Sequence, residues 1–180
     1  SGDPRRTNPD RGVAAVMTRS KLATALGLLL LAAGLCREAA AATPPIGQPP
    51  EERKLQMTLP RSQSPVWFKL WKCKVGYNDK NGLYRIAITP EVKSLAGQPV
   101  TVNGFVMPLD ASDHTQHFLL TRNTPVCMFC PPGQPNEVVE VLSPHRIVWT
   151  DKIVTVTGPL TLVNNGEKGI FFKIIADRVQ

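Results

Sequence analysis

Short apolar runs separated by turn-forming residues dominate residues 84–180. Apolar and polar side chains alternate within the runs, as in strands with one buried face. No run shows the 3.6-residue period of a long amphipathic helix. Asn81-Gly82 and Asn164-Asn165-Gly166 are typical of hairpin turns. The pattern predicts six or seven short strands, at residues 84–89, 99–108, 117–121, 137–142, 152–158, 159–163 and 170–179.

Strands of this length and spacing predict a small antiparallel β-barrel of the all-β class. Gly104 lies inside the run 99–108, and a glycine there marks the bulge or sharp coil with which small barrels close. The run that begins at Leu95 and the last hairpin resemble the first strand and closing hairpin of oligonucleotide/oligosaccharide-binding (OB) barrels. We therefore expect an OB-like barrel, with residues 65–75 as a strand or irregular lead-in.

A different pattern precedes the barrel. Met17 is followed by two basic residues, an apolar run at 22–35 and small residues at 39–42. This is the three-part organisation of a secretory signal peptide, and the run is too short for a comfortable membrane span. We expect cleavage near Ala42, a periplasmic or secreted product, and no stable membrane span after cleavage.

These patterns predict four segments in the chain. Residues 43–64 carry five prolines among polar residues without the period of a helix or strand, which is typical of an extended linker. The predicted segments are an upstream extension (1–16), a signal peptide (17–42), a disordered Pro-rich linker (43–64) and an OB-like β-barrel domain (65–180).

The charge of the chain does not indicate a nucleic-acid partner. The formal net charge is +7, but residues 43–180, with 15 basic and 11 acidic residues, carry only +4. A dedicated nucleic-acid binder concentrates far more positive charge. Trp67 and Trp71 are a candidate platform for stacking bases, but we expect them to close one end of the barrel.

Two pairs of residues form the main chemical constellation. His114 and His117 are three residues apart, as are Cys127 and Cys130. Imidazoles and thiolates at such spacing suit a tetrahedral zinc site. The sequence therefore predicts a metal site with these four ligands, for zinc or, because Met128 lies between the cysteines, for copper.

A disulfide between Cys127 and Cys130 is the competing interpretation, because an exported protein meets an oxidising compartment. Three prolines close behind Cys130 disfavour the helix that a thioredoxin-type redox pair requires. Cys73 leaves the mature domain with an odd number of cysteines, so one thiol must stay free, bind metal or pair between chains.

The sequence does not support an enzyme. No Ser/His/Asp grouping, glycine-rich phosphate loop or framed pair of carboxylates is present, and Glu137 and Glu140 are expected on opposite faces of a strand. We therefore expect a protein without catalytic activity.

Two stretches carry a resemblance to a known family. Residues 98–110, Gln-Pro-Val-Thr-Val-Asn-Gly-Phe-Val-Met-Pro-Leu-Asp, and residues 127–141, which begin Cys-Met-Phe-Cys-Pro-Pro-Gly, resemble the bacterial domain of unknown function 3299. The likeness extends over residues 66–178. Members look like small exported proteins, some encoded near transporter genes linked to zinc supply, so the resemblance implies periplasmic metal handling without assigning any residue a role.

Two functions follow as expectations. The first is an exported metal-binding accessory protein that captures zinc and passes it to a membrane transporter or another envelope protein. The second is a periplasmic binding or assembly module, without enzymatic activity, in which Cys127 and Cys130 form a structural disulfide. The oxidation state of the two cysteines separates these functions.

Overall fold

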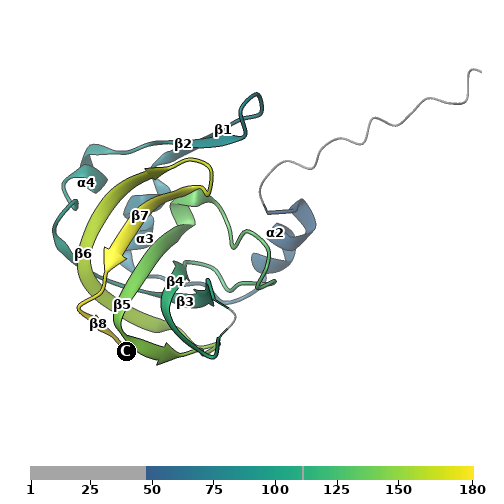
Figure 1. The fold of residues 1–180 in the computed structure, drawn as a ribbon. Coiled ribbons are helices and arrows are strands. Elements are labelled where there is room, and N and C mark those ends of the chain that lie inside the picture. The colour runs from purple at the N-terminus through teal and green to yellow at the C-terminus, as the bar shows by residue number, and fades with distance from the viewer. Residues whose placement is uncertain (1–47, 111) are drawn as a thin grey trace, which may run out of the picture. The chain divides into compact units, whose positions relative to one another are not determined.

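The computed structural model describes residues 48–110 and 112–180 (Figure 1). The predicted signal peptide, the predicted upstream extension and the first residues of the predicted linker lie outside the described residues. The elements are α2 (Pro50–Gln56), α3 (Pro65–Trp71), β1 (Lys74–Asn78), β2 (Leu83–Ala87), α4 (Pro90–Lys93), β3 (Pro99–Pro108), β4 (His114–Thr121), η1 (Pro135–Glu137), β5 (Val138–Val148), β6 (Val154–Asn165), β7 (Ile170–Ile175) and β8 (Arg178–Val179).

Five strands form a closed barrel, which confirms the predicted fold class (Figure 1). Their order is β3-β4-β5-β7-β6, and β6 returns to pair with β3. All neighbours are antiparallel except β5 and β7, which pair in parallel with Glu140 opposite Lys173. This connectivity is that of a five-stranded OB barrel, in which closure removes the unpaired strand edges.

Gly104 is the point at which β3 changes partners. Residues 99–104 pair with β6, whereas residues 105–108 pair with β4. A Cβ atom at Gly104 would lie 2.5 Å from the carbonyl oxygen of Thr121. The strand can therefore coil this tightly only because the position has no side chain, as the sequence predicts.

Residues 65–71 differ from the prediction, because they form helix α3 instead of a strand or an irregular lead-in. Trp67 lies fully buried in the main core cluster, and its Nε1 donates a hydrogen bond to the carbonyl of Asn103 at 2.7 Å. Trp67 is thus a core residue and not an exposed platform for bases. Trp71 is exposed on the same helix, with the Arg122 guanidinium 5.7 Å from its ring.

The predicted disordered linker is wrong over its described part. Pro50–Gln56 is helix α2, with proline at its start, two glutamates in its first turn and two basic residues in its last turn. Proline is favoured in the first turn of a helix, and acidic residues at its start and basic residues at its end interact favourably with the helix dipole. The backbone of Arg61 pairs with that of Asn123 in an isolated antiparallel β-bridge, so the chain is already part of the domain before residue 65.

The remaining small elements follow the prediction only in part: the hairpin turn at Asn81-Gly82 is confirmed, whereas two of the predicted strands are one. The turn at Asn81-Gly82 joins β1 and β2 into a separate hairpin, with Gly82 at a φ of 69°. Residues 90–93 form the single helical turn α4, capped by the Thr89 side chain. The apolar runs 152–158 and 159–163 belong to one strand, β6. Among the described residues, no helix is long and apolar enough to cross a membrane.

Candidate functional site

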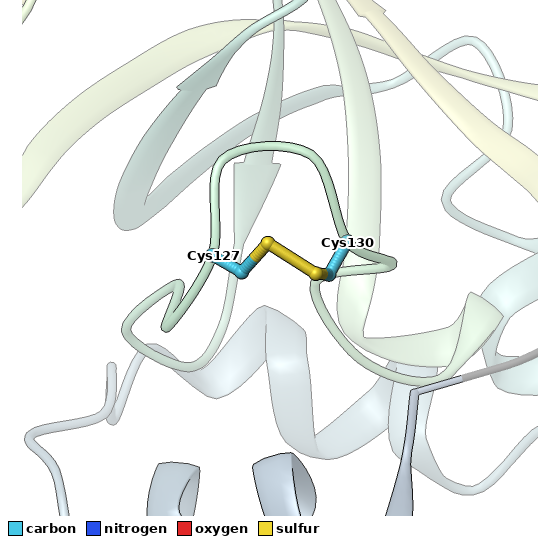
Figure 2. The surroundings of a disulfide bond; sticks show 2 residues. All are labelled: Cys127 and Cys130. Carbon is cyan, nitrogen blue, oxygen red and sulfur yellow. A yellow bond between two sulfur atoms is a disulfide. The ribbon is translucent and has the colours of Figure 1, made fainter.

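The loop between β4 and β5 carries the two cysteines. Cys127 and Cys130 are joined as a disulfide, with their Cα atoms 5.3 Å apart (Figure 2). The structure thus has the pair in one of the two states that the sequence left open. A disulfide sulfur carries no negative charge, so in this state the two residues are not thiolate ligands.

Helix α2 holds this loop in place from both ends. The Gln56 side chain is buried, and its Nε2 donates to the carbonyl oxygens of Thr124 at 3.1 Å and Pro132 at 2.9 Å. These two carbonyls lie on either side of the disulfide in the sequence. One amide group therefore fixes both arms of the loop to the helix, as buried polar groups require partners.

Arg53 adds a charged connection between α2 and η1. Its Nη1 and Nη2 atoms donate to the two carboxylate oxygens of Glu137 at 2.7 and 2.9 Å. Glu137 also accepts from the backbone N–H of Gln134 at 3.1 Å, in a capping box. A two-pronged guanidinium–carboxylate pair is both strong and directional.

Glu137 is buried, yet it stays ionised. Burial by itself would raise its pKa, but the hydrogen bonds from Arg53 and from the Gln134 backbone, with the nearby positive charge of Arg53, outweigh that effect. The pKa of Glu137 is therefore lowered from its usual value. The negative charge has a structural use, because it keeps the helix and the loop together.

The histidines predicted as metal ligands lie on a different part of the barrel. His114 and His117 are exposed on β4, which has a bulge between Thr115 and His117. The His117 Nε2 is 2.7 Å from the Glu140 carboxylate. Among the described residues, neither histidine belongs to the group of close ligand atoms that contains the cysteines, so the structure does not bring the four predicted ligands together.

Glu140 connects the His117 ring to β7. Burial acts to raise its pKa, but the His117 hydrogen bond and the nearby Lys173 lower the pKa from its usual value. His117, Glu140 and Lys173 form a chain of polar contacts across three neighbouring strands. The histidine thus has a partner that needs no metal.

Glu52 is a site residue that the sequence interpretation missed. Among the described residues, its carboxylate and the sulfurs of Cys127 and Cys130 form a group whose ligand atoms all lie within 4.8 Å of one another. The Glu52 Oε2 atom is buried and has no hydrogen-bond partner in the part of the chain described. Pro50-Glu51-Glu52 is a typical start of a helix and could have indicated α2, but the prolines around it are also typical of a linker.

The tip of the cysteine loop presents an apolar surface. Phe129, between the two cysteines, is 99% exposed, and Leu109, Met128 and Trp149 are also exposed. An open hollow of about 580 Å³ is lined by these four side chains and Met107. A second hollow of about 370 Å³ shares Met107, Leu109 and Phe129. We call the four exposed side chains the Phe129 surface.

Cys73 has no role at this site. It is a free cysteine buried to 1% exposure in the main core. The carbonyl of Cys73 accepts a hydrogen bond from the side chain of Asn136 at 2.9 Å. Its place is that of a small apolar residue.

The fold and the loop together define a small OB-type barrel with a disulfide-bearing loop fastened by an N-terminal helix. The model of the family described as "Protein of unknown function (DUF3299)" matches residues 51–169, so the chain belongs to the DUF3299 family. This confirms the resemblance seen in the sequence. The match begins in helix α2, ahead of the domain start predicted at residue 65.

One solved structure is similar to this chain. It is a DUF3299 family protein from Pseudomonas aeruginosa PAO1, with 21% sequence identity and a TM-score of 0.43. The alignment covers 53% of this chain and 66% of that chain, slightly less than two thirds of its length. No curated protein matches the sequence.

Proposed function

We propose that this protein is an exported accessory protein of the bacterial envelope that binds a partner protein through the Phe129 surface and catalyses no reaction. The observation that carries the proposal is Phe129, fully exposed between two cysteines whose disulfide holds its loop. A large apolar side chain kept in water costs free energy unless a partner covers it. Contiguous exposed apolar groups commonly mark interaction sites.

The expected partner is an extended protein segment with a large apolar side chain flanked by basic residues. The hollow next to Phe129 can receive the apolar side chain. The charged side chains that line this hollow, Asp110 and Asp113, are both acidic although the chain as a whole is basic. Complementary charges steer the encounter and exclude wrong partners.

The export part of the proposal is supported by the signal-like stretch at residues 17–42 and by the disulfide, which is typical of an oxidising compartment. The absence of catalysis is proposed because two carboxylates that could act as acid or base are engaged in structural contacts: Glu137 with Arg53, and Glu140 with His117 and Lys173.

Two short fluorescent peptides test the docking proposal. Both carry a central Leu-Ser-Phe; one is flanked by lysines and the other by glutamates. We expect the lysine peptide to bind, measured by fluorescence anisotropy, with an affinity that falls as salt rises. Phe129→Ala should weaken binding at least about tenfold, as loss of a buried aromatic anchor does. Ile175→Ala, which removes another exposed apolar side chain, should not.

Three results would contradict the docking proposal. Equal binding of the two peptides would show that the acidic hollow does not select basic flanks. An unchanged affinity in Phe129→Ala would show that the peptide does not bind at the cysteine loop. Sedimentation of the protein alone provides the third. A concentration-dependent dimer that Phe129→Ala abolishes would identify a second copy of this chain as the occupant.

Metal handling linked to a transporter is the second candidate function. The sequence and the family resemblance both led to it, with zinc as the expected ion and copper as the alternative. Within the described residues, the group of close ligand atoms contains the cysteines but neither His114 nor His117, so the four-ligand site is not part of this proposal. The observation that favours a metal function is the group formed by Glu52, Cys127 and Cys130.

A further inference from the structure

Glu52 is a half-buried acidic residue with one carboxylate oxygen, Oε2, that is shielded from water. It comes from the first turn of α2 and lies against the disulfide sulfurs, and Oε2 has no hydrogen-bond partner within the described residues. An ionised oxygen placed next to an uncharged disulfide gains nothing from that neighbour. Buried carboxylates are normally paired with cations or hydrogen-bond donors.

The contacts around Glu52 do not depend on the disulfide. Gln56 fastens α2 to Thr124 and Pro132, on both sides of the cysteine pair, and Arg53 fastens it to Glu137. Breaking the S–S bond leaves all of these contacts intact. The two thiols of the reduced loop would therefore remain beside the carboxylate.

We propose that reduction of Cys127–Cys130 creates a zinc site whose ligands are Cys127, Cys130 and Glu52. A dithiol is the reductant: its two thiols become a disulfide while the S–S bond of the protein breaks and its sulfurs gain two electrons and two protons. Zinc then displaces those two protons and binds two thiolates and one carboxylate oxygen. This proposal does not depend on the docking function.

The ligand set favours zinc among the metals that bind thiolates. Zn²⁺ accepts both sulfur and carboxylate ligands in a tetrahedral site, whereas Cu(I) selects soft sulfur or nitrogen ligands. Three protein ligands leave the fourth position for water or for a group from another molecule. An open position of this kind suits an ion that must be passed on. Exchange with a disulfide oxidant, which takes up the two electrons and becomes a dithiol while Cys127–Cys130 re-forms, would release it.

Zinc titration of the full chain tests the proposal, with the free metal followed by a chromophoric chelator. The oxidised protein and the protein reduced with a phosphine are compared. We expect one zinc per chain in the reduced form and none of comparable affinity in the oxidised form. Cobalt added to the reduced form should give a thiolate-to-metal absorption band. The paired substitution Cys127→Ser, Cys130→Ser should abolish binding, although Cys36 and Cys73 remain.

A matched pair of variants tests the carboxylate. Glu52→Gln should weaken zinc binding to the reduced chain at least about tenfold, because even groups that only support a ligand are worth 10- to 100-fold. Glu51→Gln removes the same charge from the next, exposed position and should leave the affinity unchanged. Circular dichroism spectra should show that both variants keep the fold.

Three results would overturn the zinc site. One is equal zinc affinity of the oxidised and reduced chains, and another is a Glu52→Gln affinity equal to that of the wild type. The third is loss of binding in His114→Ala, His117→Ala, which would mean that the reduced loop rearranges to meet the histidines. None of these results would affect peptide binding at Phe129, so the two proposals can fail separately.

Discussion

Gly104 shows how a single residue without a side chain permits the closed barrel. The carbonyl of Thr121 occupies the space where a Cβ would be, and Leu120 Cγ is 3.0 Å from the same point. A methyl group there would push β3 away from β4 at the point where β3 leaves β6. The position therefore constrains the whole closure and not only a local turn.

Gly104→Ala is expected to destabilise the protein by about 1 to 3 kcal/mol, the usual cost of inserting a group into a packed site. Gly76→Ala is the matched control: Gly76 also lies in a strand, but a Cβ there meets nothing within 4 Å. Urea unfolding, followed by tryptophan fluorescence, measures both free energies of unfolding. Equal values for the two variants would show that the close approach at Thr121 does not constrain the strand.

Residue-level features with a local signal could be predicted from the sequence. A glycine inside a strand-like run indicated the coil at Gly104, and a large aromatic residue near the first strand indicated the buried Trp67. Glu52 could not be predicted as part of a site, because its partners lie about 75 residues further along the chain. Only the folded domain brings that carboxylate to the two sulfurs.

At the level of elements, the attachment of α2 depends on the ionised state of Glu137. Its pKa is lower in the folded protein than its usual value of about 4.3. The charge therefore contributes stability at pH values above the unfolded pKa, and that contribution is lost as the pH falls through the folded pKa. Helix α2 should therefore detach from the cysteine loop more readily in acid than at neutral pH.

Glu137→Gln should lower the free energy of unfolding at pH 7 by about 3 kcal/mol, because Arg53 would keep its charge without a full partner. The difference from the wild type should shrink as the pH falls below the unfolded pKa, and vanish once the pH passes the lowered folded pKa and the wild-type carboxylate becomes neutral. Glu140→Gln is the control, because its partner His117 is 46% exposed, and it should cost about 1 kcal/mol or less. A Glu137→Gln effect independent of pH would contradict the charged role.

The strands were predictable as elements, whereas the short helices were not. Alternation identified the five barrel strands because each has one face in the core. Helices α2 and α3 span only seven residues each, too few for a helical period to emerge. Such helices are stable only through tertiary contacts, here Gln56 and Arg53 for α2 and the buried Trp67 for α3.

At the scale of the whole molecule, the barrel supplies a rigid base, and the chemistry lies in one loop fastened to it. Strand spacing predicted a small antiparallel barrel, and the run that begins at Leu95 and the closing hairpin predicted its OB-like form. The site is defined instead by how α2 and the loop after β4 meet. Both proposed sites therefore share one loop. Phe129 lies between Cys127 and Cys130, and the proposed zinc site forms only when these two cysteines are reduced.

The compartment then decides which state of the loop exists. If the signal-like segment directs export, the protein recovered from the periplasm should begin just after Ala42, as measured by intact mass. Replacing Leu28 and Leu29 by arginine in the apolar run should retain the chain in the cytoplasm at its full mass, because a charged run is no longer recognised for export. A full-length wild-type chain in the periplasm would contradict cleavage.

Alkylation after denaturation should distinguish the same two forms by their thiols. The exported form should be labelled once, at Cys73, since Cys36 is removed with the signal and Cys127 and Cys130 are joined. The retained form should be labelled at all four cysteines, because the cytoplasm keeps thiols reduced. Three labels on the exported form would mean that the loop is reduced where the protein works. The zinc site would then be the resident state, and the disulfide the exception.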